Sequence, residues 1–171
     1  MKRIIITFAA VVAMVSGVYL FLNHRDNSTA DKVADGQKLK IVTTNSILED
    51  MVENVGKDRI ELYSIVKRGT DPHEYEPQPS DVSSASDADI LFHNGLNLET
   101  GGNGWFSKLV ETAHKKFDRD VFSASADVKA KHLTTNVNEE DPHAWLDLEN
   151  GIKYVKTITK IMKQKDPKNA K

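Results

Sequence analysis

Cysteine is missing from all 171 residues of the sequence, and its absence removes several kinds of chemistry. Without a thiol the chain forms no disulfide, offers no thiolate ligand to a metal and has no cysteine nucleophile. It also lacks the cysteine that carries the lipid of a bacterial lipoprotein. Disulfide scaffolds, cysteine-rich zinc sites and a lipid anchor of that kind are therefore excluded.

An excess of charge of one sign is also missing. The 23 Lys and Arg residues are balanced by 25 Asp and Glu residues, so the formal net charge is −2. Proteins that bind nucleic acid need a basic surface that displaces the counterions of the phosphates. The composition therefore gives no support for a nucleic-acid partner. The length fits one domain with a terminal extension.

The sequence does contain one long apolar run, from Ile4 to Leu22, directly after Lys2 and Arg3. The run is longer than the apolar core of about 7–15 residues in a secretory signal and close to the roughly 20 residues of a spanning helix. Basic residues before such a run favour retention of the N-terminus in the cytoplasm and export of the rest. Residues 1–23 are predicted to be a signal peptide or a membrane anchor, and the polar residues 24–38 a flexible linker. The exported part is then either membrane-associated through this segment or secreted.

The remaining residues, 39–171, alternate between strand-like and helix-like patterns. Strands are predicted at residues 39–43, 59–66 and 89–93, with a weaker one at either 121–122 or 132–133. Helices are predicted at residues 46–56, from 80 or 81 to 85, at 105–113 and at 152–162. Ser46 and Glu49 form a capping-box pattern, which predicts Ser46 as the cap of the first helix.

This alternation predicts an α/β fold in which a parallel sheet is flanked by helices on both faces. In such sheets, ligands bind in the loops beyond the carboxyl ends of the strands. The loops rich in proline are therefore where we expect the functional residues.

Two identical tripeptides lie in predicted loops: Asp71-Pro72-His73 and Asp141-Pro142-His143. Proline restricts its own backbone and that of the preceding residue, so a His that follows directly loses less entropy when it becomes a ligand. Neutral imidazole is the commonest nitrogen ligand of metals in proteins, and each neighbouring Asp could accept a hydrogen bond from the ring N–H. The pair predicts a metal site built from His73 and His143. A turn with a surface His explains either copy alone, but less readily both.

Two imidazoles do not complete a metal site, because zinc takes four ligands or three and a water. The nearby candidates for oxygen ligands are Glu74, Glu76, Asp141 and Asp147. The residue types leave zinc, manganese and iron open. His93 follows an apolar strand and is expected to be a strand-end residue rather than a ligand.

Three segments resemble the substrate-binding proteins of bacterial ABC transporters for manganese and zinc, in the order typical of that family. Asp71–Pro77 resembles their first metal-binding loop, and Asp141–Asp147 the second. Asn94–Asn103 is similar to their Asn-Gly-x-x-Leu-Glu segment, in the form typical of the manganese-type adhesin lipoproteins. The likeness extends from about Leu39 to the end of the chain.

The resemblance implies a fold of two α/β lobes with a metal bound between them. Residues 39–171 would be the N-terminal lobe, with His73 and His143 as its two ligands, and the chain would be a truncated form without the C-terminal lobe. The implied function is the extracytoplasmic substrate-binding component of an import system. Its partners would be a membrane permease and an ATPase, and its cargo manganese, or alternatively zinc or iron.

Two other functions are considered beside this non-enzymatic one. The first is a surface adhesin or interaction module. The second is a metal-dependent hydrolase in which Glu74 or Glu76 acts as general base on a metal-bound water. The sequence has neither a Gly-x-Ser-x-Gly motif nor a helix that places a Glu between two His residues, which makes the hydrolase the weakest of the three.

Overall fold

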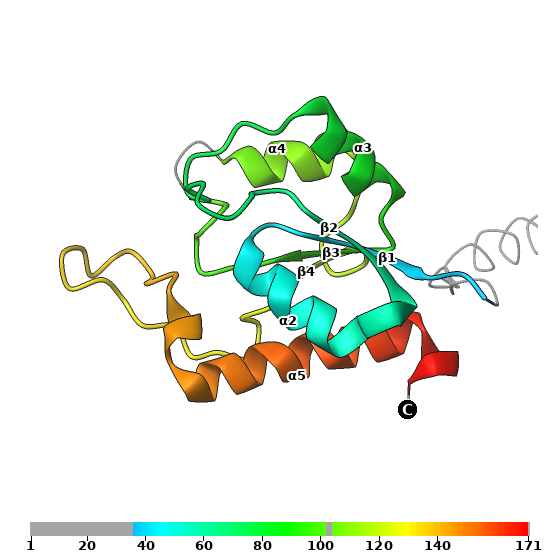
Figure 1. Ribbon diagram of the computed structural model, residues 1–171. Coiled ribbons are helices and arrows are strands. Elements are labelled where there is room, and N and C mark those ends of the chain that lie inside the picture. Colours follow the sequence, from blue (N-terminus) through cyan, green and yellow to red (C-terminus); the bar gives the residue numbers. More distant parts are fainter. Residues whose placement is uncertain (1–35, 102–103, 171) are drawn as a thin grey trace, which may run out of the picture. The chain divides into compact units, whose positions relative to one another are not determined.

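The computed structural model describes residues 36–101 and 104–170 (Figure 1). The predicted signal or anchor at residues 1–23 and most of the predicted linker lie outside these residues. Across the described ranges, no helix combines the length and the apolar character that a membrane crossing requires.

Four parallel strands form one sheet. They are β1 (Leu39–Thr43), β2 (Ile60–Ser64), β3 (Ile90–His93) and β4 (Val121–Ser123), in the spatial order β2-β1-β3-β4. Their register aligns Val42 with Tyr63 and Leu91, and Phe92 with Phe122. The predicted parallel sheet is confirmed. Of the two positions considered for the fourth strand, residues 121–122 are correct, whereas His132 makes only an isolated antiparallel bridge to Glu140.

Helices cover both faces of the sheet, as predicted (Figure 1). On one face lie α2 (Ser46–Gly56) and α5 (Leu148–Lys165), and on the other α3 (Pro79–Asp87) and α4 (Trp105–Thr112). Single 3₁₀ turns occur at η2 (Lys57–Arg59), η3 (Ala144–Leu146) and η4 (Pro167–Asn169).

Each face of the sheet has its own apolar core. The core under α2 and α5 contains Ile41, Leu48, Val52, Phe92, Tyr154 and Ile158. The core under α3 and α4 contains Val42, Leu91, Trp105, Phe106, Leu109 and Val110. Alternate residues along each strand contribute to the two cores, because successive side chains of a strand point to opposite faces of the sheet.

One predicted helix cap and two predicted helix starts differ from the structure by one to four residues. Asn45, not Ser46, caps α2, because its side chain accepts hydrogen bonds from the amides of Ile47 and Leu48, both at 3.1 Å. The helix α3 begins at Pro79, so Asp81 lies in its first turn instead of before it. The helix α5 begins at Leu148, four residues before the first residue of the predicted apolar pattern.

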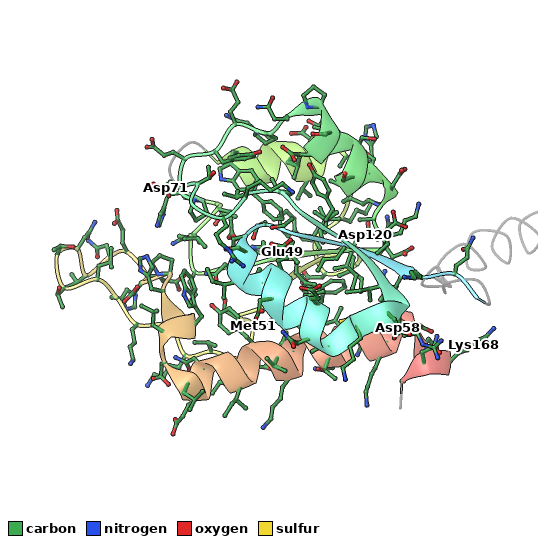
Figure 2. The ribbon with its side chains drawn as sticks, in the orientation of Figure 1. Glu49, Met51, Asp58, Asp71, Asp120 and Lys168 are labelled. Atoms are coloured by element: carbon green, nitrogen blue, oxygen red, sulfur yellow. The ribbon has the colours of Figure 1, made fainter. Side chains whose placement is uncertain are left out.

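The order of the strands determines where a ligand can be bound. The chain passes from β1 outward to β2 and then returns across β1 to β3 and β4, so the connections reverse between β1 and β3. The carboxyl edge at such a reversal is where α/β sheets bind ligands. Figure 2 shows Asp71, in the loop after β2, at the end of the molecule opposite Asp58.

Candidate metal site

Both Asp-Pro-His loops leave the sheet at its carboxyl edge. The first follows β2 and the second follows β4, which are the two outer strands of the sheet. The structure therefore brings together two segments that are distant in the sequence, at the edge where the fold predicts a ligand site.

The two loops have the same local geometry. The backbone N–H of His73 donates to Asp71 Oδ1 at 2.9 Å, and that of His143 donates to Asp141 Oδ1 at 3.0 Å. In both cases the Asp side chain bonds its own chain two residues on, which is a common turn for this residue type. The repeated tripeptide is thus a repeated structure that presents each His in the same way.

The two imidazole rings lie next to each other. Their centroids are 5.9 Å apart, and their planes are inclined at 55°. Two imidazoles bound to one tetrahedral zinc, with nitrogens at about 2.0–2.1 Å, have ring centres roughly 5 Å apart. His143 is exposed, so a rotation of its ring is enough to cover the difference. The rings are therefore close enough to share one ion.

Asp141 also contacts the ring of the His that it precedes. Its Oδ1 lies 2.9 Å from His143 Nδ1. Hydrogen bonds from the backbone N–H and then from the ring of His143 hold the pKa of Asp141 below its usual value, so it is a carboxylate at neutral pH. A proton on Nδ1, donated to this carboxylate, leaves Nε2 with a free lone pair, which is the tautomer that a metal ligand needs.

The first loop is fixed by a buried carboxylate that the sequence did not indicate. Asp81 accepts hydrogen bonds from the hydroxyl of Tyr63 at 2.7 Å, from the hydroxyl of Tyr75 at 3.0 Å and from the backbone N–H of Gln78 at 2.7 Å. Burial, followed by the bond to Asp81, raises the pKa of Tyr75 to about 12, so this phenol remains a donor at physiological pH. The sequence pattern predicts for Asp81 only a place at the start of a helix, whereas the structure also makes it the acceptor of two tyrosine hydroxyls.

A buried polar cluster lies beneath the second loop. Glu99, with an exposed fraction of 0%, accepts hydrogen bonds from Thr44 Oγ1 and from the backbone N–H of Asn94 at 2.8 Å. The amide of Asn94 donates in turn to Pro142 O at 3.0 Å. The only sequence signal for this cluster was the Asn-Gly-x-x-Leu-Glu resemblance, which named the segment but not its contacts.

The other predicted residues do not complete a metal site within this lobe. In residues 36–101 and 104–170, no group of three or more His, Asp or Glu side chains could hold a metal ion. Glu74 and Glu76 are exposed, and Asp147 caps α5 by accepting from the amide of Glu149. His93 is buried and stacks on Phe106 with centroids 4.9 Å apart, as expected of a strand-end residue. Within the described residues, the arrangement therefore brings two imidazoles together without a third side chain of this kind beside them.

The fold and the paired loops define the class of protein: an α/β ligand-binding lobe with its site at the carboxyl edge of the sheet. Residues 41–171 match the family described as zinc-uptake complex component A, periplasmic (ZnuA), and the chain belongs to that family.

Similar curated proteins have descriptions that fit this family. The manganese ABC transporter substrate-binding lipoprotein PsaA of Streptococcus pneumoniae is 50% identical over 171 residues, which are 99% of this chain and 54% of that protein. The metal ABC transporter substrate-binding lipoprotein SloC of Streptococcus mutans is 54% identical over 143 residues, 82% of this chain and 46% of that protein. The chain thus spans about half the length of the curated relatives it matches.

Two similar solved structures are also those of metal-binding proteins. The manganese-bound periplasmic metal-binding protein of Candidatus Liberibacter asiaticus has a TM-score of 0.67 and 27% identity, over 78% of this chain and 48% of that one. Zinc-bound AdcA of S. pneumoniae has a TM-score of 0.65 and 32% identity, over 78% of this chain and 27% of that one. These matches confirm the predicted family and the predicted α/β lobe.

Proposed function

We propose that this chain supplies the N-terminal, metal-binding lobe of the extracytoplasmic substrate-binding component of a metal ABC import system. The observation that carries the proposal is the pairing of His73 and His143, whose ring centroids are 5.9 Å apart at the carboxyl edge of the sheet. Membership of a family described as a periplasmic uptake component supports the same role. The partners would be a membrane permease and its ATPase.

A divalent transition metal is the cargo, and we infer manganese first. PsaA, at 50% identity, carries manganese in its name, whereas the structure of AdcA contains zinc. Imidazole ligands are compatible with both metals, and manganese prefers additional oxygen ligands. Those oxygens would come from a second lobe, which the family resemblance predicts.

Attachment to the membrane must differ from that of the relatives named lipoproteins. Because the chain has no cysteine, a cysteine-linked lipid cannot anchor it. We infer that the apolar run Ile4–Leu22 takes this role as an uncleaved anchor, or is removed to release the lobe. Mass spectrometry of the N-terminal peptide from membrane and soluble fractions distinguishes these two outcomes.

The metal role is tested by calorimetric titration of the 171-residue chain, kept in detergent, with Zn²⁺ and with Mn²⁺. We expect weak binding, because only two ligands are present, and a loss of zinc affinity of at least about tenfold in the His73→Ala, His143→Ala double variant. The control is His114→Asn, which removes an exposed imidazole where φ is 56° and Asn is tolerated. Equal zinc affinity in the wild type and the double variant would refute the proposal.

A further inference from the structure

Each of the two His residues follows a proline whose carbonyl accepts a side-chain N–H from one short segment of the chain. Trp105 Nε1 donates to Pro72 O at 3.0 Å, and Asn94 Nδ2 donates to Pro142 O at 3.0 Å. Trp105 begins α4, and Asn94 directly follows β3. The backbone unit before each imidazole is thus tied to the same β3–α4 connection, although the two loops come from opposite edges of the sheet.

The amide of Asn94 has a single orientation in this environment. The residue is 1% exposed, and its Oδ1 accepts from the hydroxyl of Tyr154 at 2.9 Å. Its Nδ2 donates both to Pro142 O and to Gly95 O, at 3.0 and 2.9 Å. Exchange of the amide oxygen and nitrogen would place an oxygen against the two carbonyl oxygens of Gly95 and Pro142, so these contacts fix which atom faces Pro142. Tyr154 remains a donor over the physiological range because burial raises its pKa to about 12.

Glu99 holds the backbone of Asn94 from the other side. Its Oε1 accepts from Thr44 Oγ1, at the end of β1, and from Asn94 N, at the end of β3. A fully buried carboxylate is costly to desolvate and is retained only where hydrogen bonds or charges compensate it. Here those bonds join the ends of the two central strands directly beneath the second Asp-Pro-His loop.

His143 has little other support of its own. It is exposed; its backbone N–H and its ring bond Asp141, whose side chain is itself 40% exposed, and its carbonyl accepts from the backbone N–H of Leu146 at 3.1 Å in the turn η3. Pro142, between them, is buried and accepts the bond from Asn94. The bond between Asn94 and Pro142 therefore ties the residue directly before His143 to the buried cluster, while Ala144 and Trp145, directly after it, pack against the core of that face.

We propose that Asn94 is a positioning residue for the metal site: held by Glu99 and Tyr154, it fixes the carbonyl of Pro142 and thereby the separation of the His143 ring from the His73 ring. This inference rests on the proposed function, because it assigns Asn94 a part in the metal site. Residues of this kind, which orient a ligand without touching the metal, typically change metal affinity by 10–100-fold when they are replaced.

The test is Asn94→Asp in the full 171-residue chain in detergent. The substitution keeps the size of the side chain and the acceptor for Tyr154, but replaces the donating amide by a carboxylate oxygen that repels Pro142 O. We expect zinc affinity to fall about tenfold in calorimetric titration. In the metal-free protein, the ¹H–¹⁵N ring signals of His143 should shift and broaden while those of His73 stay in place.

The matched control is Asn54→Asp, which makes the same change of charge and also removes a side-chain bond to a backbone carbonyl, that of Asp50 at 2.8 Å on the exposed face of α2. It should leave both ring signals and the zinc affinity as in the wild type. Tyr154→Phe is the second variant. It keeps the amide of Asn94 but removes the donor to its oxygen, so His143 signals should move in the same direction by a smaller amount.

Unchanged His143 signals and unchanged zinc affinity in Asn94→Asp would overturn the proposal. So would equal shifts at His73 and His143 in an Asn94→Asp variant that still unfolds cooperatively, since that pattern reports a general change of the core. If Asn94→Asp does not fold, unmoved His143 signals in Tyr154→Phe overturn it. Should zinc binding ignore both His residues, the proposed function fails, yet the metal-free His143 signals still test the link from Asn94 to His143.

Discussion

Single residues in the two loops act through the atoms next to them in the chain. Asp71 and Asp141 each bond the amide two residues on, and Asp141 additionally contacts the ring of His143. Within the part of the chain that the structure describes, Asp71 bonds the backbone N–H of His73 but not its ring. The two loops therefore share a backbone turn but differ in the contact of the Asp with the imidazole. The tautomer of His143 is therefore set by a neighbour in its own loop.

A first prediction follows for Asp141→Asn. The Asn oxygen can still accept the amide of His143, but a neutral acceptor binds the ring N–H less strongly than a carboxylate does. Zinc affinity should fall about tenfold, with the midpoint of thermal unfolding little changed because the side chain is partly exposed. Titration with Zn²⁺ measures the effect. The control, Asp58→Asn, lies at the opposite end of the molecule (Figure 2) and should bind as the wild type does; equal loss in both variants would contradict the prediction.

The two helices on one face of the sheet contribute residues to the buried polar cluster around Glu99 and Asn94. Asn45, the cap of α2, lies two residues beyond β1, and its side-chain nitrogen Nδ2 is also 3.5 Å from Glu99 Oε1. The start of the helix and the polar cluster are thus joined at one residue. The helix α5 contributes Tyr154 to that cluster, so both helices on this face support the second loop.

A second prediction concerns the cap of α2. Asn45→Ala removes the acceptor for the amides of Ile47 and Leu48, and such caps contribute about 0.5–2 kcal/mol. We expect the free energy of unfolding in urea to fall by about 1 kcal/mol. The comparison is Asn54→Ala, inside the same helix and exposed, where the better helix propensity of Ala opposes the lost bond to Asp50. A loss no larger for Asn45 than for Asn54 would exclude the capping role.

At the scale of the whole molecule, residues 36–101 and 104–170 form one α/β unit, and no group of three or more His, Asp or Glu side chains in them could hold a metal ion. Two nitrogen ligands leave at least two positions of a tetrahedral zinc, or more of a manganese ion, to other groups. The relatives are about twice as long as this chain, which agrees with ligands from a second lobe. Under the proposed function, the remaining ligands would therefore come from outside the described residues.

A third prediction belongs to the stability of the folded unit. The pKa of Tyr154 is raised to about 12 by burial, against about 10 in an unfolded chain. The folded state holds this proton more strongly, so its stabilising contribution is complete below pH 10 and is lost as the pH rises from 10 to 12. Between these pH values, the free energy of unfolding should fall by up to about 1.4 kcal/mol per pH unit because of this one group. Urea unfolding at pH 9 and pH 11.5 measures it. Tyr154→Phe should reduce the difference without abolishing it, because the pKa of Tyr75 is also raised to about 12.

The sequence by itself determined the elements, the parallel sheet and the two Asp-Pro-His loops, because these depend on local periodicity and on the restricted backbone around proline. It misplaced the cap of α2 by one residue, since Ser46 and Asn45 are both good caps and only the backbone conformation selects between them. Only the tertiary structure decided that His73 and His143 lie side by side, that Asn94 donates to Pro142 and that Asp81 binds two tyrosines. Those contacts join residues far apart in the chain. Strand order and packing, rather than any local sequence pattern, determine which of these residues meet.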